Sequence, residues 1–150
     1  MSKTFRINRR VTFGDANPQG TMYWAKYCEV VGLVREEFLF SILTKRDEFP
    51  QMVATGIVIE TCDFSAKYHK SAFLCDSLVV ALNVTNLNQC SVELLIDFFK
   101  LNEAGTEELL TTTRTKLAFF DTNKGKPTRM PDFVRSRAAE YEVPDPNHKS

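Results

Sequence analysis

The chain has 150 residues, of which 43% are hydrophobic and 25% are charged, as in a single soluble globular domain. Lysine and arginine total 19, and so do aspartate and glutamate, so no net charge would draw the chain to nucleic acid or to a membrane. No apolar run approaches the roughly 20 residues of a membrane helix, and the N-terminus lacks the apolar stretch of a signal peptide, so we expect a cytoplasmic protein.

The first part of the chain changes from a strand pattern to a helix pattern. Residues 5–13 alternate between apolar and polar, which predicts a strand. Glycine, aspartate, asparagine and proline crowd residues 14–20, which predicts a tight turn. Over residues 23–42 apolar side chains recur at three- and four-residue steps, which predicts one long amphipathic helix. Residues 45–48 form its polar end, and Pro50 is expected to stop any continuation.

The rest of the chain is dominated by strand patterns. Four segments rich in Val, Ile, Thr, Leu and Phe are separated by turn signals, at residues 56–67, 77–87, 91–101 and 109–121. A short helix is predicted over residues 131–141, and residues 144–150 are expected to be frayed. One strand, one long helix and four consecutive strands predict an α+β fold in a single domain over residues 1–143. A bare edge strand in such a sheet favours pairing with a second copy.

The cysteines and the known short motifs indicate what the chain does not contain. Cys28, Cys62, Cys75 and Cys90 have no CxxC spacing and no neighbouring histidine pair, so we expect buried free thiols and no metal site. There is no phosphate loop, dinucleotide fingerprint or serine-nucleophile elbow, so no cofactor is predicted. His69 lies in a polar stretch and is interpreted as an exposed loop residue.

The turn Gly14-Asp15-Ala16-Asn17-Pro18-Gln19-Gly20 is the first candidate for chemistry. The simpler interpretation is a polar connection between a strand and a helix. The functional interpretation is that free amides at the helix start stabilise an oxyanion, while Asp15 and Asn17 hold a water or a carbonyl. A calcium loop is excluded because its twelfth position requires glutamate and here is Lys26.

Arg35 is the second candidate. On a helical wheel it lies about 70° from the centre of the apolar stripe, at the edge of the face expected to be buried. Glu29, Gly32 and Glu36 lie on the opposite face. One interpretation is that the stem of Arg35 covers apolar surface while its head reaches water. The other is that its guanidinium is directed at a carbonyl or carboxylate of a ligand.

Residues 11–27, VTFGDANPQGTMYWAKY, resemble the opening motif of acyl-CoA thioesterases of the 4-hydroxybenzoyl-CoA thioesterase type. Their pattern is a strand, D-x-D-x-x-G, and a helix that starts near a tyrosine. Tyr68, followed by a loop and Asp76, resembles their second signature. The resemblance implies the hotdog fold: one long helix wrapped by an antiparallel five-stranded sheet, with a short C-terminal helix here. In that family the second aspartate is the catalytic carboxylate, but this chain has Asn17 there, and Asp15 matches the non-catalytic one.

A subgroup is similar to the chain at both candidate positions: the hotdog thioesterases of enediyne polyketide biosynthesis. They are similar in having asparagine at Asn17 and arginine at Arg35, within the run Arg35-Glu36-Glu37-Phe38-Leu39, and in the stretch Thr61-Cys62-Asp63-Phe64. This resemblance implies hydrolysis of a polyene β-ketoacyl chain from an acyl carrier protein domain of a polyketide synthase, or from CoA. The released β-keto acid can then lose CO2. We expect a homodimer, paired into a homotetramer.

The resemblance also implies a role for each site residue. Asn17 and Arg35 would orient and polarise the thioester carbonyl, and the backbone amides of Met22 and Tyr23 would bind the oxyanion. Water would attack without a strong base, because a β-ketoacyl thioester is an activated electrophile. Phenylalanines would line a tunnel for the chain. Further substrate contacts are expected from four residues, namely Asp15, Tyr27, Thr61 and Phe38.

Two alternatives stay open at this point. The first is a general acyl-CoA thioesterase in which Asp15 supplies the carboxylate. The second is a non-catalytic hotdog protein that binds and protects an acyl chain.

Overall fold

The computed structural model describes residues 2–43 and 45–147. Its elements follow the predicted order of strand, long helix, four long strands and short helix, with two small additions. They are β1 (Phe5–Arg10), α1 (Trp24–Ile42), α2 (Glu48–Ala54), β2 (Ile57–Tyr68), β3 (Ser77–Thr85), β4 (Ser91–Leu101), β5 (Glu107–Asp121), β6 (Lys126–Pro127) and α3 (Asp132–Ala139).

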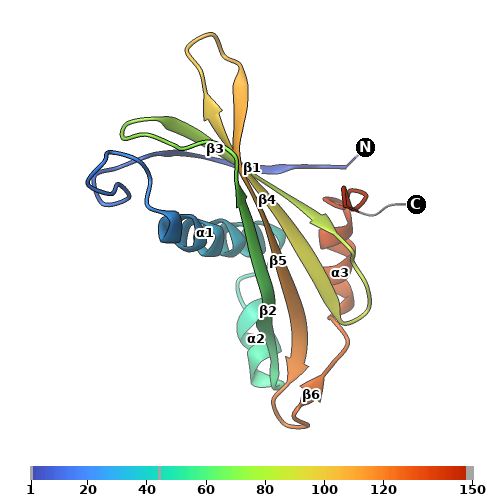
Figure 1. The fold of residues 1–150 in the computed structure, drawn as a ribbon. Coiled ribbons are helices and arrows are strands. Elements are labelled where there is room, and N and C mark those ends of the chain that lie inside the picture. The colour runs from blue at the N-terminus through green and yellow to red at the C-terminus, as the bar shows by residue number, and fades with distance from the viewer. Residues whose placement is uncertain (1, 44, 148–150) are drawn as a thin grey trace.

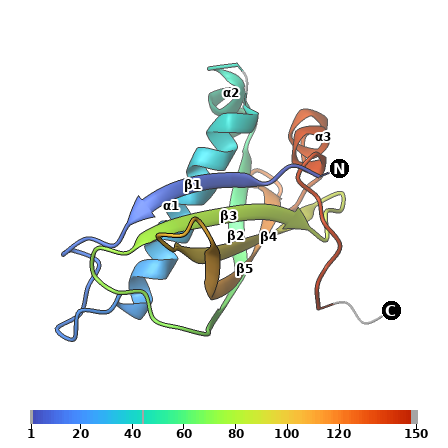
Figure 2. The ribbon, with the colours of Figure 1, turned by 90° about the horizontal axis from the view of Figure 1, so that it is seen from above.

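All strand pairs in the sheet are antiparallel, and the five long strands lie in the order β1-β3-β4-β5-β2. The strands curve past one side of α1, which lies across the concave face of the sheet (Figures 1 and 2). The short strand β6 pairs with the end of β5. Strand β2 is hydrogen-bonded only to β5 within the described chain, so its outer edge is open.

The core lies between α1 and the concave face of the sheet. The buried side chains of α1 occur at the predicted helical spacing: Tyr27, Val30, Val31, Val34, Phe38 and Ile42. Glu29, Gly32 and Glu36 are exposed on its other face, as predicted. In β4 the residues that face the helix alternate strictly: Val92, Leu94, Ile96 and Phe98. Each fully buried side chain of this size contributes about 1.5–3 kcal/mol of transfer free energy.

The structure differs from the prediction near the ends of the first strand and the long helix. Strand β1 ends at Arg10, so Phe13 lies in the turn, is 85% exposed and does not continue the buried side of the strand. Pro50 lies inside a second short helix, α2, that the sequence did not indicate. It is tolerated because the backbone N–H groups of a first helical turn have no intrahelical acceptor.

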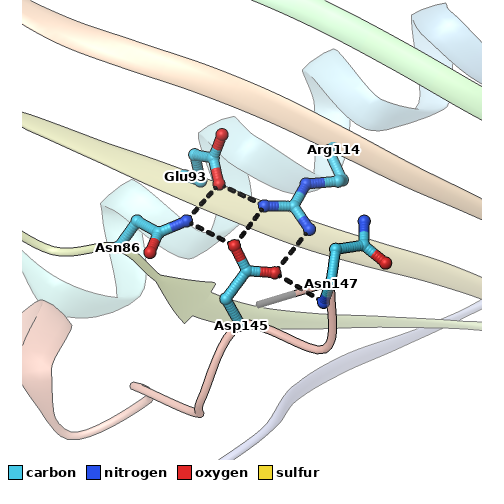
Figure 3. Close-up of polar contacts among 5 residues, drawn as sticks. All are labelled: Asn86, Glu93, Arg114, Asp145 and Asn147. Atoms are coloured by element: carbon cyan, nitrogen blue, oxygen red, sulfur yellow. Dashed lines mark hydrogen bonds and ion pairs between the residues drawn. The ribbon is translucent and has the colours of Figure 1, made fainter. Parts of the chain in front are cut away.

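The C-terminal segment is held against the sheet. Residues 144–147 were expected to be frayed, but Asp145 accepts two hydrogen bonds from Arg114 at 2.7 and 3.0 Å and one from Asn86 at 2.8 Å (Figure 3). Arg114 also bonds to Glu93, so one guanidinium joins β4, β5 and the tail. Residues 148–150 lie outside the described part of the chain.

The cysteines are free, as predicted, but their expected burial is wrong. Cys28, Cys62 and Cys75 are exposed and Cys90 is half-buried. No helix among the described residues is long and apolar enough to cross a membrane.

Candidate active site

Asn17 organises the turn that precedes α1. Its Oδ1 accepts hydrogen bonds from the amides of Gln19 and Thr21, at 3.0 and 3.1 Å, and its Nδ2 donates to the Thr21 hydroxyl at 2.8 Å. The backbone closes the same loop, since the Asn17 amide donates to the Thr21 carbonyl at 2.8 Å. These bonds use one of the two Nδ2 hydrogens, so the second hydrogen remains for a ligand.

Asp15 is a structural anchor of the turn. It is 4% exposed, and one carboxylate oxygen pairs with Arg9 at 2.7 Å while the other accepts from the amide and the hydroxyl of Thr12, both at 3.0 Å. Burial opposes ionisation, but the bonds from Thr12 and Arg9 outweigh it and lower the pKa of Asp15 below its ordinary value. A carboxylate that is so engaged and so weakly basic is a poor general base at neutral pH.

The start of α1 offers amides at positions different from those expected. The amide of Met22 donates to the Ala72 carbonyl and that of Tyr23 donates to the Asp15 carbonyl, each at 2.8 Å. Within the described chain, no hydrogen bond engages the next two amides, those of Trp24 and Ala25, and no side chain caps the helix. The donors free to bind an oxyanion are therefore one or two residues further along the chain than the sequence suggested.

Arg35 lies half-buried at the edge of the apolar face of α1, as its position on the helical wheel predicts. Its Nη1 donates to the hydroxyl of Thr61 on β2 at 2.7 Å. A β-bulge follows Thr61, where the register shifts between Thr61 and Asp63. Thr61 thus holds one arm of the guanidinium and leaves the remaining donors for a ligand.

Arg35 is also the only charged residue that lines an apolar pocket between α1 and the sheet, as the described residues define it. The pocket is nearly closed, with a cavity volume of about 20 Å³, so a bound chain requires the lining side chains to move apart. All other lining residues are apolar: Phe38, Leu39, Ile42, Ile59, Val84, Val92, Leu94, Leu117, Phe119, Met130, Val134 and Ala138. Two of the twelve phenylalanines therefore line it, Phe38 among them.

Tyr27 does not face this pocket. It is 2% exposed and packs edge-on against Tyr68 and Phe98, with ring centroids 5.2 and 5.0 Å apart. Burial raises the pKa of Tyr27. It lies in the aromatic core and also lines a separate pocket at the start of α1, beside Met22 and Trp24.

A single chain does not bring Asn17 and Arg35 together. Arg35 lies eleven residues beyond Trp24, the first residue of α1. At roughly 1.5 Å per residue this separation is about 16 Å along the helix axis, and Asn17 precedes the helix start. If Asn17 and Arg35 act on the same thioester, as the resemblance implies, one of them must therefore come from a second chain.

The comparisons with known proteins agree with this architecture. The model of the thioesterase-like superfamily matches residues 11–138. A solved structure of the dynemicin thioesterase, studied for polyene binding, superposes with a TM-score of 0.82 at 23% identity, covering 94% of this chain and 99% of that one. A 1,4-dihydroxy-2-naphthoyl-CoA thioesterase from Synechocystis gives a TM-score of 0.78 at 18% identity, covering 98% and 100%. A 4-hydroxybenzoyl-CoA thioesterase variant bound to 4-hydroxybenzoyl-CoA gives 0.77 at 17% identity, covering 89% and 97%. No curated protein sequence matches significantly.

The fold is the hotdog fold, and its class of chemistry is thioester hydrolysis. The chain belongs to the thioesterase-like superfamily.

Proposed function

We propose that this thioesterase releases a polyene β-ketoacyl chain from the acyl carrier protein domain of a polyketide synthase, in the cytoplasm and without a catalytic carboxylate. The observation that carries the proposal is the apolar pocket with Arg35 as its one charged lining residue. Such a pocket suits a hydrocarbon chain whose polar end stays beside a guanidinium. The released β-keto acid can then lose CO2.

The lining of the pocket favours an apolar chain over a hydroxylated ring. A 4-hydroxybenzoyl or dihydroxynaphthoyl group, as in the names of two structural neighbours, carries hydroxyls that need hydrogen-bond partners when buried. Arg35 is the single polar residue of the described pocket, so a buried aryl hydroxyl beyond it would lose its bonds to water without replacement.

We propose that the site is completed across a homodimer in which two β2 strands pair antiparallel along their open edges. Tyr68 lies at one end of β2, and its hydroxyl donates to the Trp24 carbonyl at 3.1 Å, so the start of α1 is beside that end. Full antiparallel pairing would place the partner's Tyr68 opposite Ile57. Thr61, which holds Arg35, is four residues from Ile57 and seven from Tyr68. At about 3.3 Å per residue, Thr61 would be about 13 Å along the strands from the partner's Tyr68, compared with about 23 Å from its own Tyr68.

In this arrangement the turn of one subunit and the arginine of the other hold the thioester. The free Nδ2 hydrogen of Asn17 and the free arm of Arg35 would polarise the carbonyl, and the amides of Trp24 and Ala25 would receive the oxyanion. A water oxygen attacks the carbonyl carbon, the carbon–sulfur bond breaks, and the proton released by the water goes to the departing thiolate. The β-keto group makes the carbonyl electrophilic enough for this attack without a strong base.

The general acyl-CoA thioesterase that uses Asp15 has less support. Both carboxylate oxygens of Asp15 are engaged by Arg9 and Thr12, and its pKa is lowered. Using it as a base would require breaking a buried ion pair. The proposal also includes the acyl carrier protein as partner and the pairing of two dimers into a homotetramer. Native mass spectrometry of the purified protein would check the number of subunits, and the same measurement with added acyl carrier protein would check the partner.

The test is acid release from matched acyl-carrier-protein and CoA thioesters. Wild type should release a polyene β-keto acid or its decarboxylated ketone, and Asn17→Ala and Arg35→Ala should each lose activity while remaining folded. Asp15→Asn should keep turnover per folded molecule, which the Asp15 mechanism forbids. If wild type retains the chain and never releases it, the protein is the non-catalytic acyl-binding type.

A further inference from the structure

We propose that α3 is the end wall of the apolar pocket and that Met130 limits the length of acyl chain that this enzyme hydrolyses. The inference rests on the proposed function, because it assigns the pocket to the acyl chain. It adds a specificity-determining residue from a part of the molecule far from the candidate active site.

The direction of the pocket follows from the order of the strands that line it. Arg35 and Thr61 mark its β2 side, and the sheet then passes through β5 and β4 to Val84 on β3. The lining strands from β2 to β3 span three interstrand spacings of about 4.8 Å, or about 14 Å. An extended chain entering at Arg35 would therefore run across the strands beneath α1.

The C-terminal segment closes the opposite side. Met130, Val134 and Ala138 line the pocket, and each is at most 5% exposed. The chain after α3 pairs with β3 through the bridge between Val84 and Glu142, so α3 lies beside the strand farthest from Arg35 among those that line the pocket (Figure 1). A longer acyl chain meets α3 rather than solvent.

Met130 is held at this wall by its backbone. Its amide donates to the Gln89 carbonyl at 2.8 Å, and two residues earlier the Thr128 amide donates to the Phe119 carbonyl at 2.9 Å. The side chain is 1% exposed. The unbranched thioether of Met130 packs into irregular space, so the volume of this side chain, and no polar contact, determines how much room remains for an acyl chain.

The wall is fixed to the rest of the molecule by Arg137. Its Nη1 donates to the Ile42 carbonyl at the end of α1, at 2.7 Å, and to Glu48 of α2 at 2.8 Å. The guanidinium also lies 5.2 Å from the ring centroid of Phe133. Because the contacts with Ile42 and Glu48 hold α3 to α1 and α2, a change of volume at Met130 should alter the depth of the pocket rather than shift the helix.

The experiment is a chain-length profile of kcat/KM for straight-chain acyl thioesters of one carrier. Met130→Ala and the milder Met130→Val should shift the optimum to longer chains, and Met130→Phe to shorter ones. We expect the ratio of long-chain to short-chain kcat/KM to change by roughly tenfold in each direction. Met130→Leu, of similar volume, should leave the profile in place.

The matched control is Met52→Ala. Met52 is also a buried methionine, at 7% exposed, but it does not line the apolar pocket. It should lower stability without moving the optimum. Affinity for non-hydrolysable acyl thioethers, measured by calorimetry, should follow the same order of lengths. If all variants hydrolyse thioesters with one unchanged profile, the wall is elsewhere; if wild type hydrolyses none, the proposed function fails instead.

Discussion

Crossing the Asn17→Ala and Arg35→Ala variants in one dimer tests whether the site is composite. In the proposed dimer each active site takes Asn17 from one subunit and Arg35 from the other. Each single variant alone should lose about 10²–10³ in kcat, the typical loss when one donor to an oxyanion is removed. A heterodimer of the two variants has one site with both residues intact and one site with neither, so it should regain about half of the wild-type activity.

The control heterodimer carries both substitutions on the same subunit. A heterodimer of wild type with the Asn17→Ala/Arg35→Ala double variant has exactly one substitution in each composite site, so it should be nearly inactive. A site within one chain predicts the opposite in both cases: half activity for this control and almost none for the crossed variants. The difference between the two heterodimers is therefore about 50-fold or more in either direction.

The assay needs heterodimers of defined composition. Two affinity tags and co-expression provide them, and acid release is measured at saturating substrate directly after the second affinity step, before subunits exchange. Half activity in the wild-type/double-variant dimer, with no activity in the crossed dimer, would refute the composite site. It would also require Arg35 and Asn17 to act at separate places in one chain.

Three further outcomes follow from individual contacts. Asp15→Asn should destabilise the fold by about 3 kcal/mol, because it leaves Arg9 without its buried partner, and thermal unfolding would measure the loss. The pKa of Asp15 in the folded state is lowered from 3.8. The charge of Asp15 therefore stabilises the fold fully above pH 3.8, and this stabilisation disappears as the pH falls through the lower folded value. The difference in stability between wild type and Asp15→Asn should shrink over the same pH range. Asn17→Asp should fold normally, since a carboxylate can accept the two amide bonds of the turn and one from the Thr21 hydroxyl. Its kcat should fall roughly 100-fold, because a negative charge replaces a hydrogen-bond donor. An unchanged kcat with an unchanged melting temperature would contradict this. Thr61→Val should lower kcat about tenfold with little effect on stability, and Thr61→Ser should restore it, whereas a purely structural Thr61 would show a matching stability loss.

Periodicity predicted most of the fold because it reports which face of an element is buried. The spacing of apolar residues in α1 matched its buried face, and the edge position of Arg35 followed from the same pattern. Helix α2 was missed because Pro50 was interpreted as a terminator, although proline is compatible with a first helical turn. The anchoring of Asp145 was missed because its partner Arg114 is on β5, and no local pattern connects them.

The candidate site was predicted less completely, because its donors depend on backbone bonds between distant segments. The amide of Met22 is engaged by Ala72, fifty residues away, and that of Tyr23 by Asp15, so the free donors are the amides of Trp24 and Ala25. Met130 joins the pocket because its amide bonds to the carbonyl of Gln89, which is far away in the sequence. Neither contact can be predicted from composition or from the spacing of residues in the sequence.

The turn explains how the catalytic carboxylate of the resembled D-x-D motif can be absent while the fold stays intact. Asp15 is required by the structure: without its charge, Arg9 and Thr12 lose a buried acceptor. The position of Asn17 needs an acceptor for two amides and a partner for one hydroxyl, and an amide side chain satisfies both. Replacing aspartate by asparagine there has little structural cost, so this position is free to change the chemistry. Under the proposed function the substrate compensates for the missing base, because a β-ketoacyl thioester, with its activated carbonyl, is attacked more readily than a simple acyl thioester.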